Sequence, residues 1–406
     1  MAGRTILFTG LVRDPGRFNE LLDTIENARR HAAFDLVYST WFDELSKYPE
    51  LQMRLHKLGA HIVEQEPPTL VLPGHILHQI SAIHLGLSVV DDDDFVLKLR
   101  PDLSNNADIH DFLASAPIPV APARLFATPF RDKFHIRAAF GAHPFYVNDI
   151  TIAGRAADLK RLCLVPFVAL MRFSRLAPEQ ILWAPHFAHP SPVLSAYLSV
   201  NVGLIFNNRE GFAAARQVLM ESPLYARALA CAAVLFQDNF SFLGPDPLRP
   251  TAPQFARSQT LEALLWDQID TPYMLHNPTC FTNSLRTGGL TDAIANGSYL
   301  PSAFGDRVAA AVAAGRAPNA LRRQHHARAE LEAEATALGE RIHRDVGVMG
   351  MKFMTDAPRH RTTRGARPNW SIAQDPDART KALEVEVNML RRTIDGLNVR
   401  LSNANA

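Results

Sequence analysis

Cysteine is scarce in this sequence, and long apolar runs are missing. Only three cysteines occur among 406 residues, with no CxxC pair, so neither a zinc site nor a disulfide framework is predicted and a reducing compartment is favoured. The longest apolar candidate, residues 162–171, contains Pro166 and is too short to cross a bilayer. The first apolar core, residues 6–8, is too short for a signal peptide. We therefore expect a cytoplasmic protein, and leave peripheral contact with the inner face of a membrane open.

An excess of charge of either sign is also missing. The chain has 42 basic and 41 acidic residues, a net charge of +1. Proteins that coat nucleic acids usually carry a strong positive excess, so no nucleic-acid partner is expected. Neither GxGxxG nor GxxxxGK[ST] occurs, which removes support for dinucleotide binding and for P-loop chemistry. What is present is an apolar content of 47%, enough for one large or two ordinary domains.

Apolar patterns in the first hundred residues alternate between strand and helix. Short apolar runs predict strands at residues 4–9, 34–38, 61–63 and 95–99, and helical spacing predicts helices at 18–32, 48–58 and 75–87. This alternation is typical of an α/β protein in which helices cover both faces of a sheet. Further along, strands are expected at 134–140 and 144–152 and a helix from Gly154, whereas residues 104–125 resemble loops.

The chain divides by composition into five segments. We expect a core at 1–190, a helical completion of that core at 191–318, a long helix at 319–354, a basic flexible linker at 355–380 and a coiled coil at 381–406. The last segment carries a heptad seam, made by Leu383, Val387, Leu390, Ile394, Leu397 and Leu401. This seam predicts self-association through residues 383–401.

Charged residues gather where the strand at 95–99 ends. Lys98, Arg100 and Asp102 alternate along the chain, and side chains two residues apart in an extended segment point to the same side. Ligands of open α/β sheets bind outside the carboxyl ends of the strands. An arginine there can pair with phosphate in a forked geometry, and a carboxylate can hold a divalent metal. The alternative is a plain strand end whose charges reach solvent.

Two other strand ends carry residues suited to a nucleotide. Gly10 would let the backbone approach a ligand, and Arg13 would contact phosphate. The alternative is an ordinary strand-to-loop turn. Ser39, Thr40 and Trp41 follow the second strand, where two hydroxyls and an indole could bracket a base or a sugar. A core tryptophan beside a capping hydroxyl is the competing interpretation.

Two carboxylates are candidates for acid–base chemistry. Asp149 interrupts an apolar stretch, where an unpaired carboxylate is costly, so it needs either a partner or a chemical role. A general base that takes a proton from an acceptor hydroxyl would fit, and a salt bridge to an arginine is the alternative. Glu179 follows Pro178, and the alternative to a chemical role is that it simply begins a helix.

These groups occur in a definite order within residues 5–190. The segments, in sequence, are TGLVRD, VYSTW, EPP, HQISAIHLGL, FVLKLRPDL and FYVNDITIAG. The set resembles the WavE lipopolysaccharide-synthesis family of glycosyltransferases, which are GT-A-like. The residues that match the family pattern are Lys98, Arg100 and Asp102 in its K-x-R-x-D strand end, Gln79 in the preceding helix, and Asp149 and Gly154 in a later strand.

The resemblance implies an α/β, GT-A-like (Rossmann-like) mixed sheet flanked by helices, and the sequence pattern after residue 318 adds a C-terminal helical extension. It implies an enzyme that moves a sugar from a nucleotide-sugar donor to a glycan or lipid-linked acceptor. Donor contacts are then expected from Gly10, Arg13, Ser39, Thr40, Trp41, Gln79, Lys98, Arg100 and Asp102. Asp149 and Glu179 would serve the acceptor. Mn²⁺ or Mg²⁺ at Asp102 is implied, although Arg100 stands where other GT-A enzymes have the first carboxylate of a DxD motif.

Two other functions stay open from the sequence. A binding or scaffold protein could keep this fold without turnover and recruit a partner through its coiled coil. A phosphotransferase or hydrolase acting on a phosphorylated carbohydrate could use the same arginine and aspartate groups. Deletion of residues 355–406 distinguishes the glycosyltransferase from the scaffold protein, because a transferase should keep donor binding and a scaffold should lose its partner.

Overall fold

The structure is a computed structural model that describes part of the chain. The described residues are 3–70, 72, 75–120, 128–137, 139–140, 144–147, 149–166, 169–170, 176, 178–188, 191–200, 218–219, 221–243 and 328–356. The chain forms two compact units, residues 1–353 and 354–406. The predicted coiled coil at 381–406 and nearly all of the linker at 355–380 lie outside the described residues, so self-association through 383–401 stays a prediction.

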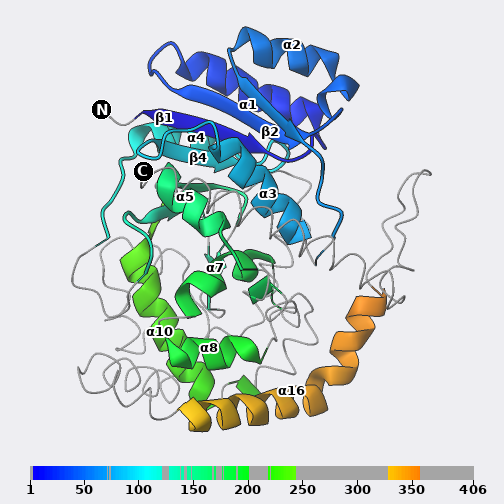
Figure 1. Ribbon diagram of the computed structural model, residues 1–406, viewed down its shortest axis with the longest axis vertical. Coiled ribbons are helices and arrows are strands. Elements are labelled where there is room, and N and C mark those ends of the chain that lie inside the picture. The colour runs from blue at the N-terminus through cyan, green and yellow to red at the C-terminus, as the bar shows by residue number, and fades with distance from the viewer. Residues whose placement is uncertain are drawn as a thin grey trace, which may run out of the picture. The chain divides into compact units, whose positions relative to one another are not determined.

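The first unit contains a seven-stranded mixed sheet (Figure 1). Its spatial order is β3-β2-β1-β4-β8-β5-β9. The strands are β1 Arg4–Thr9, β2 Asp35–Trp41, β3 His61–Gln65, β4 Phe95–Leu99, β5 Phe134–Ile136, β8 Ile152–Arg155 and β9 Phe240–Phe242. The first four strands are parallel, β8 is antiparallel to both β4 and β5, and β9 is parallel to β5. The mixed α/β sheet expected from the sequence is confirmed.

The helices in the described part of the chain are α1 Pro15–Ala28, α2 Pro49–Lys57, α3 Ile76–Leu87, α4 Asn106–Ala114, α5 Ala156–Cys163, α7 Pro178–Ala188, α8 Pro192–Ser199, α10 Pro223–Asn239 and α16 Arg328–Asp356. Of these, α3 and α5 pack on one face of the sheet, and α1 and α4 pack on the other. Side chains of β1 alternate between two cores: Leu7 packs in the core that contains residues of α3 and α5, and Ile6 and Phe8 pack in the core that contains residues of α1 and α4. Burial on both faces explains why the strands are apolar runs.

Three local predictions were wrong, and the first two misses have a capping and a pairing cause, respectively. Residues 104–125 were expected to be loops, yet they contain α4, because Asn105 and Asp108 form a capping box at its start. The strand expected at 144–152 is broken. β7 covers Tyr146–Val147 and pairs with β6, Ala139–Phe140, while β8 begins only at Ile152. Asp149 therefore lies between two strands and does not interrupt one.

Gly154 was expected to begin a helix, but it lies inside β8 and α5 begins at Ala156. A side chain at Gly154 would meet the Phe134 ring on the neighbouring strand β5, because its Cβ would lie 2.9 Å from Phe134 Cδ1. A glycine is thus required at position 154 because the Phe134 side chain of β5 approaches the β8 backbone closely. The periodicity of the sequence around Gly154 does not predict this contact.

A glycine also brings α3 close to the sheet. A Cβ on Gly86 would lie 2.5 Å from Leu7 Cδ1 and 3.0 Å from Ser39 Cβ, and both residues are fully buried. Gly86→Ala should therefore lower the free energy of unfolding. The overpacking cost of about 1–3 kcal/mol exceeds the gain of about 1 kcal/mol in helix propensity. Urea unfolding measures the change.

Gly16→Ala in α1 is the matched control for Gly86→Ala. A Cβ on Gly16 would make only an ordinary contact, 3.5 Å from Asp14 Oδ1. We expect this variant to be neutral or stabilising. A Gly86→Ala variant as stable as Gly16→Ala would show that the sheet does not limit the approach of α3.

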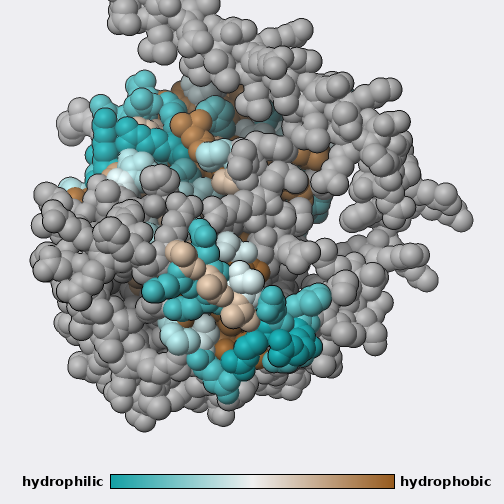
Figure 2. Space-filling model, turned by 60° about the horizontal axis from the view of Figure 1, so that its bottom comes forward, coloured by the Kyte–Doolittle hydropathy of each residue, from teal (hydrophilic) through white to brown (hydrophobic). Residues whose placement is uncertain are grey.

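The helix α16 lies within and slightly beyond the range 319–354 that the sequence indicated. Its buried side chains recur at helical spacing, namely Leu331, Ala335, Leu338 and Ile342. Figure 2 shows that the described atoms on the face turned toward the viewer are mostly hydrophilic, with apolar atoms in narrow bands. None of the helices in the described ranges combines the length and apolarity that crossing a bilayer requires.

Candidate functional site

The strand order reverses beside β1, and the candidate site lies at the carboxyl ends of the two strands there. From β1 the chain proceeds outward through β2 and β3, and it then returns to place β4 on the opposite side of β1. Such a switch point is where open α/β sheets bind ligands, next to the loops that follow the two central strands. Here those loops begin with Gly10 after β1 and with Arg100 after β4.

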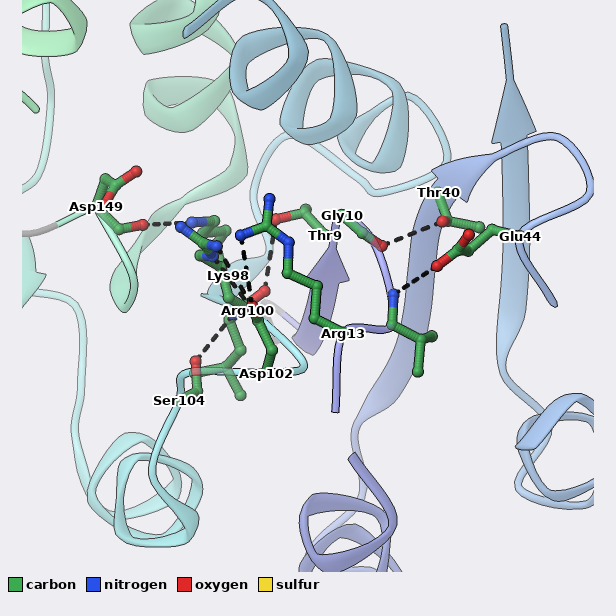
Figure 3. Close-up of polar contacts among 12 residues, drawn as sticks. Thr9, Gly10, Arg13, Thr40, Glu44, Lys98, Arg100, Asp102, Ser104 and Asp149 are labelled. Atoms are coloured by element: carbon green, nitrogen blue, oxygen red, sulfur yellow. Dashed lines mark hydrogen bonds and ion pairs between the residues drawn. The ribbon is translucent and has the colours of Figure 1, made fainter. Parts of the chain in front are cut away.

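Two guanidinium groups converge on one buried carboxylate at this switch point (Figure 3). Arg100 Nε lies 3.4 Å from Asp102 Oδ1, and Arg13 Nη1 lies 4.0 Å from Asp102 Oδ2. Asp102 is 3% exposed, whereas the side chain of Arg13 is 58% exposed. The structure therefore brings Arg13, Arg100 and Asp102 together, as the sequence predicted for the strand ends.

The charges of this cluster favour an anionic ligand. One carboxylate neutralises one of the two guanidinium groups, so a net positive charge remains beside the strand ends. The exposed Arg13 can turn toward a ligand at little cost, while Arg100 is oriented by its contact with Asp102. Two arginines presented in this way match the oxygen geometry of a phosphate or diphosphate.

A divalent metal at Asp102 does not fit the described residues. The carboxylate already faces two guanidinium groups, which would repel a cation placed between them. Nowhere in the part of the chain that the structure describes do three or more His, Cys, Asp or Glu side chains gather in a way that could hold a metal ion. Stabilisation of an anion at this site therefore has to come from its arginines.

Gly10 shapes the loop that carries Arg13. Its φ of +103° is a conformation that side-chain-bearing residues rarely adopt. The Gly10 carbonyl accepts hydrogen bonds from Tyr38 Oη at 2.9 Å and from Thr40 Oγ1 at 3.1 Å, and its N–H donates to the Ser39 carbonyl. Thr40, predicted to contact a ligand, is fully buried and braces this loop.

A buried glutamate that sequence reasoning missed also supports the loop. Glu44 Oε1 accepts the Val12 N–H at 2.8 Å, and Glu44 Oε2 pairs with Lys47 Nζ at 2.7 Å. The Tyr48 hydroxyl donates to the Val12 carbonyl. No local pattern predicts these contacts, because Glu44 and Val12 are 32 residues apart and meet only when β1 and β2 pair.

Ser39 and Trp41 have different environments at the end of β2. Ser39 is fully buried and lies next to Gly86 of α3. The Trp41 indole meets the His78 ring edge-on at a centroid distance of 5.7 Å, and His78 lies 5.3 Å from the His75 ring. Burial lowers the pKa of His75, and the charge of Arg13 lowers it further. This aromatic group therefore lies on the Arg13 side of the site, with Gln79 beside His78 in the first turns of α3.

Lys98 connects β4 to the segment that carries Asp149. The lysine is 2% exposed, and its Nζ donates to the Asp149 carbonyl (Figure 3). Asp149 is also buried, and its Oδ2 has no hydrogen-bond partner among the described residues. Leaving a buried acceptor without a hydrogen bond costs about 1–3 kcal/mol of stability. Such a group in a folded protein requires an explanation, and a role in catalysis or ligand binding is one.

The buried ammonium of Lys98 predicts a stability change at alkaline pH. Burial lowers the pKa of Lys98 to about 8, and the charge of Asp149 partly opposes this shift. The unfolded chain therefore binds more protons between about pH 8 and 10.5, so this group makes the free energy of unfolding rise with pH across that window. Below about pH 8, the charged and buried Lys98 lowers the free energy of unfolding by on the order of 3 kcal/mol.

Lys98→Met should remove this dependence. Urea unfolding of the wild type and the variant, repeated from neutral pH to about pH 10.5, gives the difference in stability between them. That difference should shift in favour of the wild type as pH rises, because the titrating groups that do not interact with Lys98 are shared and cancel. A difference that stays constant across the window would contradict a charged, buried Lys98.

Glu179 lies apart in sequence, in the first turn of α7. It is half-buried, and the next residue, Gln180, donates from Nε2 to the Pro144 carbonyl ahead of β7 at 3.0 Å. This bond ties α7 to the stretch of chain that leads toward Asp149. The structure thus places Asp149 beside Lys98 at the carboxyl edge, and Glu179 on a helix that supports the same stretch.

Comparison with other proteins adds no assignment. No protein-family model matches this sequence, and no curated protein matches it.

Proposed function

We propose that this protein is a glycosyltransferase that moves a sugar from a nucleotide-sugar donor to a glycan or lipid-linked acceptor of surface-polysaccharide or glycoconjugate assembly. The observation that carries the proposal is the convergence of Arg13 and Arg100 on Asp102 at the switch point of the sheet. A diphosphate is the ligand group whose charge and shape match this pair of arginines.

The sheet supports a GT-A-like form of this fold. β8 is a single antiparallel strand inserted between the parallel strands β4 and β5. Its insertion brings the start of β8, and with it Asp149, to the edge where β1 and β4 end. A donor held at the β1 and β4 loops and an acceptor near Asp149 would then meet at one edge. This arrangement agrees with the resemblance to WavE-type sequences, which remains part of the proposal.

The arginines would act on the leaving group. Breaking the bond between the sugar and the diphosphate places negative charge on the diphosphate oxygens. Positive groups held in place before the reaction stabilise that charge without reorganising. Arg100, oriented by Asp102, and the exposed Arg13 are positioned to supply this stabilisation. The aromatic group of Trp41, His75 and His78 lies on the Arg13 side, where the nucleoside of the donor would extend.

Asp149 would act on the acceptor. Its Oδ2 is a buried oxygen without a partner in the described part of the chain, so it is free to accept the proton of an acceptor hydroxyl. The backbone of this residue is fixed by Lys98, which limits how far the carboxylate can drift. Glu179 on α7 is the second candidate for contact with the acceptor.

Incubation with UDP-, GDP- and CMP-sugars tests the proposal. One donor should raise the unfolding temperature and should be hydrolysed slowly in the absence of acceptor. Both effects should persist in EDTA, because the arginines replace a metal. An absence of response to every donor, with or without Mn²⁺, would overturn the proposal. Loss of a bound partner on deletion of residues 355–406 would then favour the scaffold function.

A further inference from the structure

A fully buried ion pair lies next to the segment that follows Asp149. Arg137 follows β5, and its Nη1 lies 2.8 Å from Oδ1 of Asp108 in α4. The side chains of Arg137 and Asp108 are 1% and 0% exposed, respectively. Burial raises the pKa of Asp108, and the charge of Arg137 opposes that shift. Two charges taken from water in this way cost several kcal/mol each, and their attraction repays this only with further hydrogen bonds.

The second oxygen of Asp108 receives those hydrogen bonds. The Thr151 hydroxyl donates to Asp108 Oδ2 at 2.8 Å, and the Asn105 N–H donates to the same oxygen at 3.1 Å. Thr151 is fully buried and stands two residues after Asp149. Asp108 therefore contacts both Arg137 and the segment that carries the proposed base, Asp149.

The segment 149–151 is held at each of its residues by a different element. Lys98 of β4 donates to the Asp149 carbonyl, Ile150 packs on Leu103 of the β4 loop, and Thr151 donates to Asp108 of α4. These contacts fix the backbone at Asp149 and at the two residues that follow it. The carboxylate itself keeps one oxygen without a partner among the residues described.

We propose that Asp108, held by Arg137, is a positioning residue that fixes the Asp149 carboxylate through the Thr151 hydroxyl. The inference rests on the proposed function, in which Asp149 accepts the proton of the acceptor. A well-packed apolar cluster would stabilise this place at least as well as a buried ion pair does. The bonds that Asp108 Oδ2 accepts from Thr151 and Asn105 are directional, and they set the place of a backbone segment more narrowly than apolar contacts do.

Thr151→Val tests this inference, because it removes the hydroxyl and keeps the volume. We expect kcat with a good donor and acceptor to fall by roughly 10- to 100-fold, since small misplacements of a reacting group have effects of this size. The KM for the donor should stay unchanged. Amide hydrogen exchange should accelerate in peptides that cover residues 149–152. Thr151→Ser keeps the hydroxyl and should restore both readouts.

Thr24→Val in α1 is the matched control. Thr24 is also largely buried and donates to a backbone carbonyl, that of Glu20, but it belongs to a helix away from Asp149. It should change stability only. Unchanged exchange at 149–152 in Thr151→Val, or a kcat equal to that of Thr151→Ser, would overturn the positioning role. A wild type without activity on any donor would instead overturn the proposed function. Hydrogen exchange would then still test whether the bond between Asp108 and Thr151 holds residues 149–152 in place.

Discussion

Replacing Arg100 with methionine is expected to lower kcat/KM for the nucleotide-sugar donor by about 10²–10³-fold, the usual loss when one group that stabilises developing charge is removed. Arg100 is the better oriented of the two arginines, because its Nε lies 3.4 Å from Asp102 Oδ1 and its backbone N–H donates to Ser104 Oγ. Methionine keeps an unbranched apolar stem and removes the guanidinium. Steady-state kinetics of transfer or donor hydrolysis measures the loss.

Arg100→Lys should restore only a small part of the lost activity. Lysine keeps the charge but loses the planar fork that pairs with two phosphate oxygens. Arg54→Met in α2 is the matched control, because Arg54 pairs with acidic residues of α1, among them Glu26 at 3.6 Å, and takes no part in the Asp102 cluster. It should leave kcat/KM unchanged. An Arg100→Met variant with wild-type kcat/KM would show that the donor diphosphate does not bind at Arg100.

Replacing Asp149 with asparagine is expected to lower kcat for transfer by about 10²–10⁴-fold, the range that general base catalysis contributes. Asparagine has nearly the same shape, and the backbone carbonyl that Lys98 contacts is retained. Donor binding should persist, because the arginines that hold the diphosphate are untouched. The measurement is transfer to an acceptor under saturating donor, with donor affinity obtained separately by calorimetry.

Asp93→Asn is the control for the loss of a carboxylate. Asp93 lies in the turn before β4, at the opposite end of that strand from Arg100, and its side chain is 80% exposed. This variant should keep the activity of the wild type. If Asp149→Asn retains kcat within about tenfold, Asp149 is not the base, and the same experiment on Glu179→Gln becomes decisive.

The residues at the ends of β1 and β4 illustrate how much of the site was accessible from the sequence. Gly10, Arg13, Arg100 and Asp102 follow apolar runs, and parallel strands bring their carboxyl ends to one edge. Their proximity was therefore predictable without coordinates. Thr40 and Lys98 also belong to this region, but they turned out to brace neighbouring backbone carbonyls, those of Gly10 and Asp149. A side chain's partner depends on what packs over it, and strand periodicity does not specify that.

Contacts between distant segments were beyond the sequence. Glu44 meets Val12 across 32 residues, and Thr151 meets Asp108 across 43 residues. Both contacts depend on the register between strands and on how helices seat against the sheet. The break between β7 and β8, which frees Asp149 from a strand, likewise follows from β8 pairing with β4 and β5. Each of these facts is a property of the packed chain.

The sequence by itself determined the succession of strands and helices in the first hundred residues, and it put basic and acidic groups just past two strand ends. Local periodicity and apolar content act within a few residues, so they could be read directly. Only the tertiary structure decided that β8 runs antiparallel between β4 and β5, that Asp102 lies between two guanidinium groups, and that Asp108 reaches Thr151. These arrangements depend on which distant surfaces bury one another, and that competition is resolved only when the whole core forms.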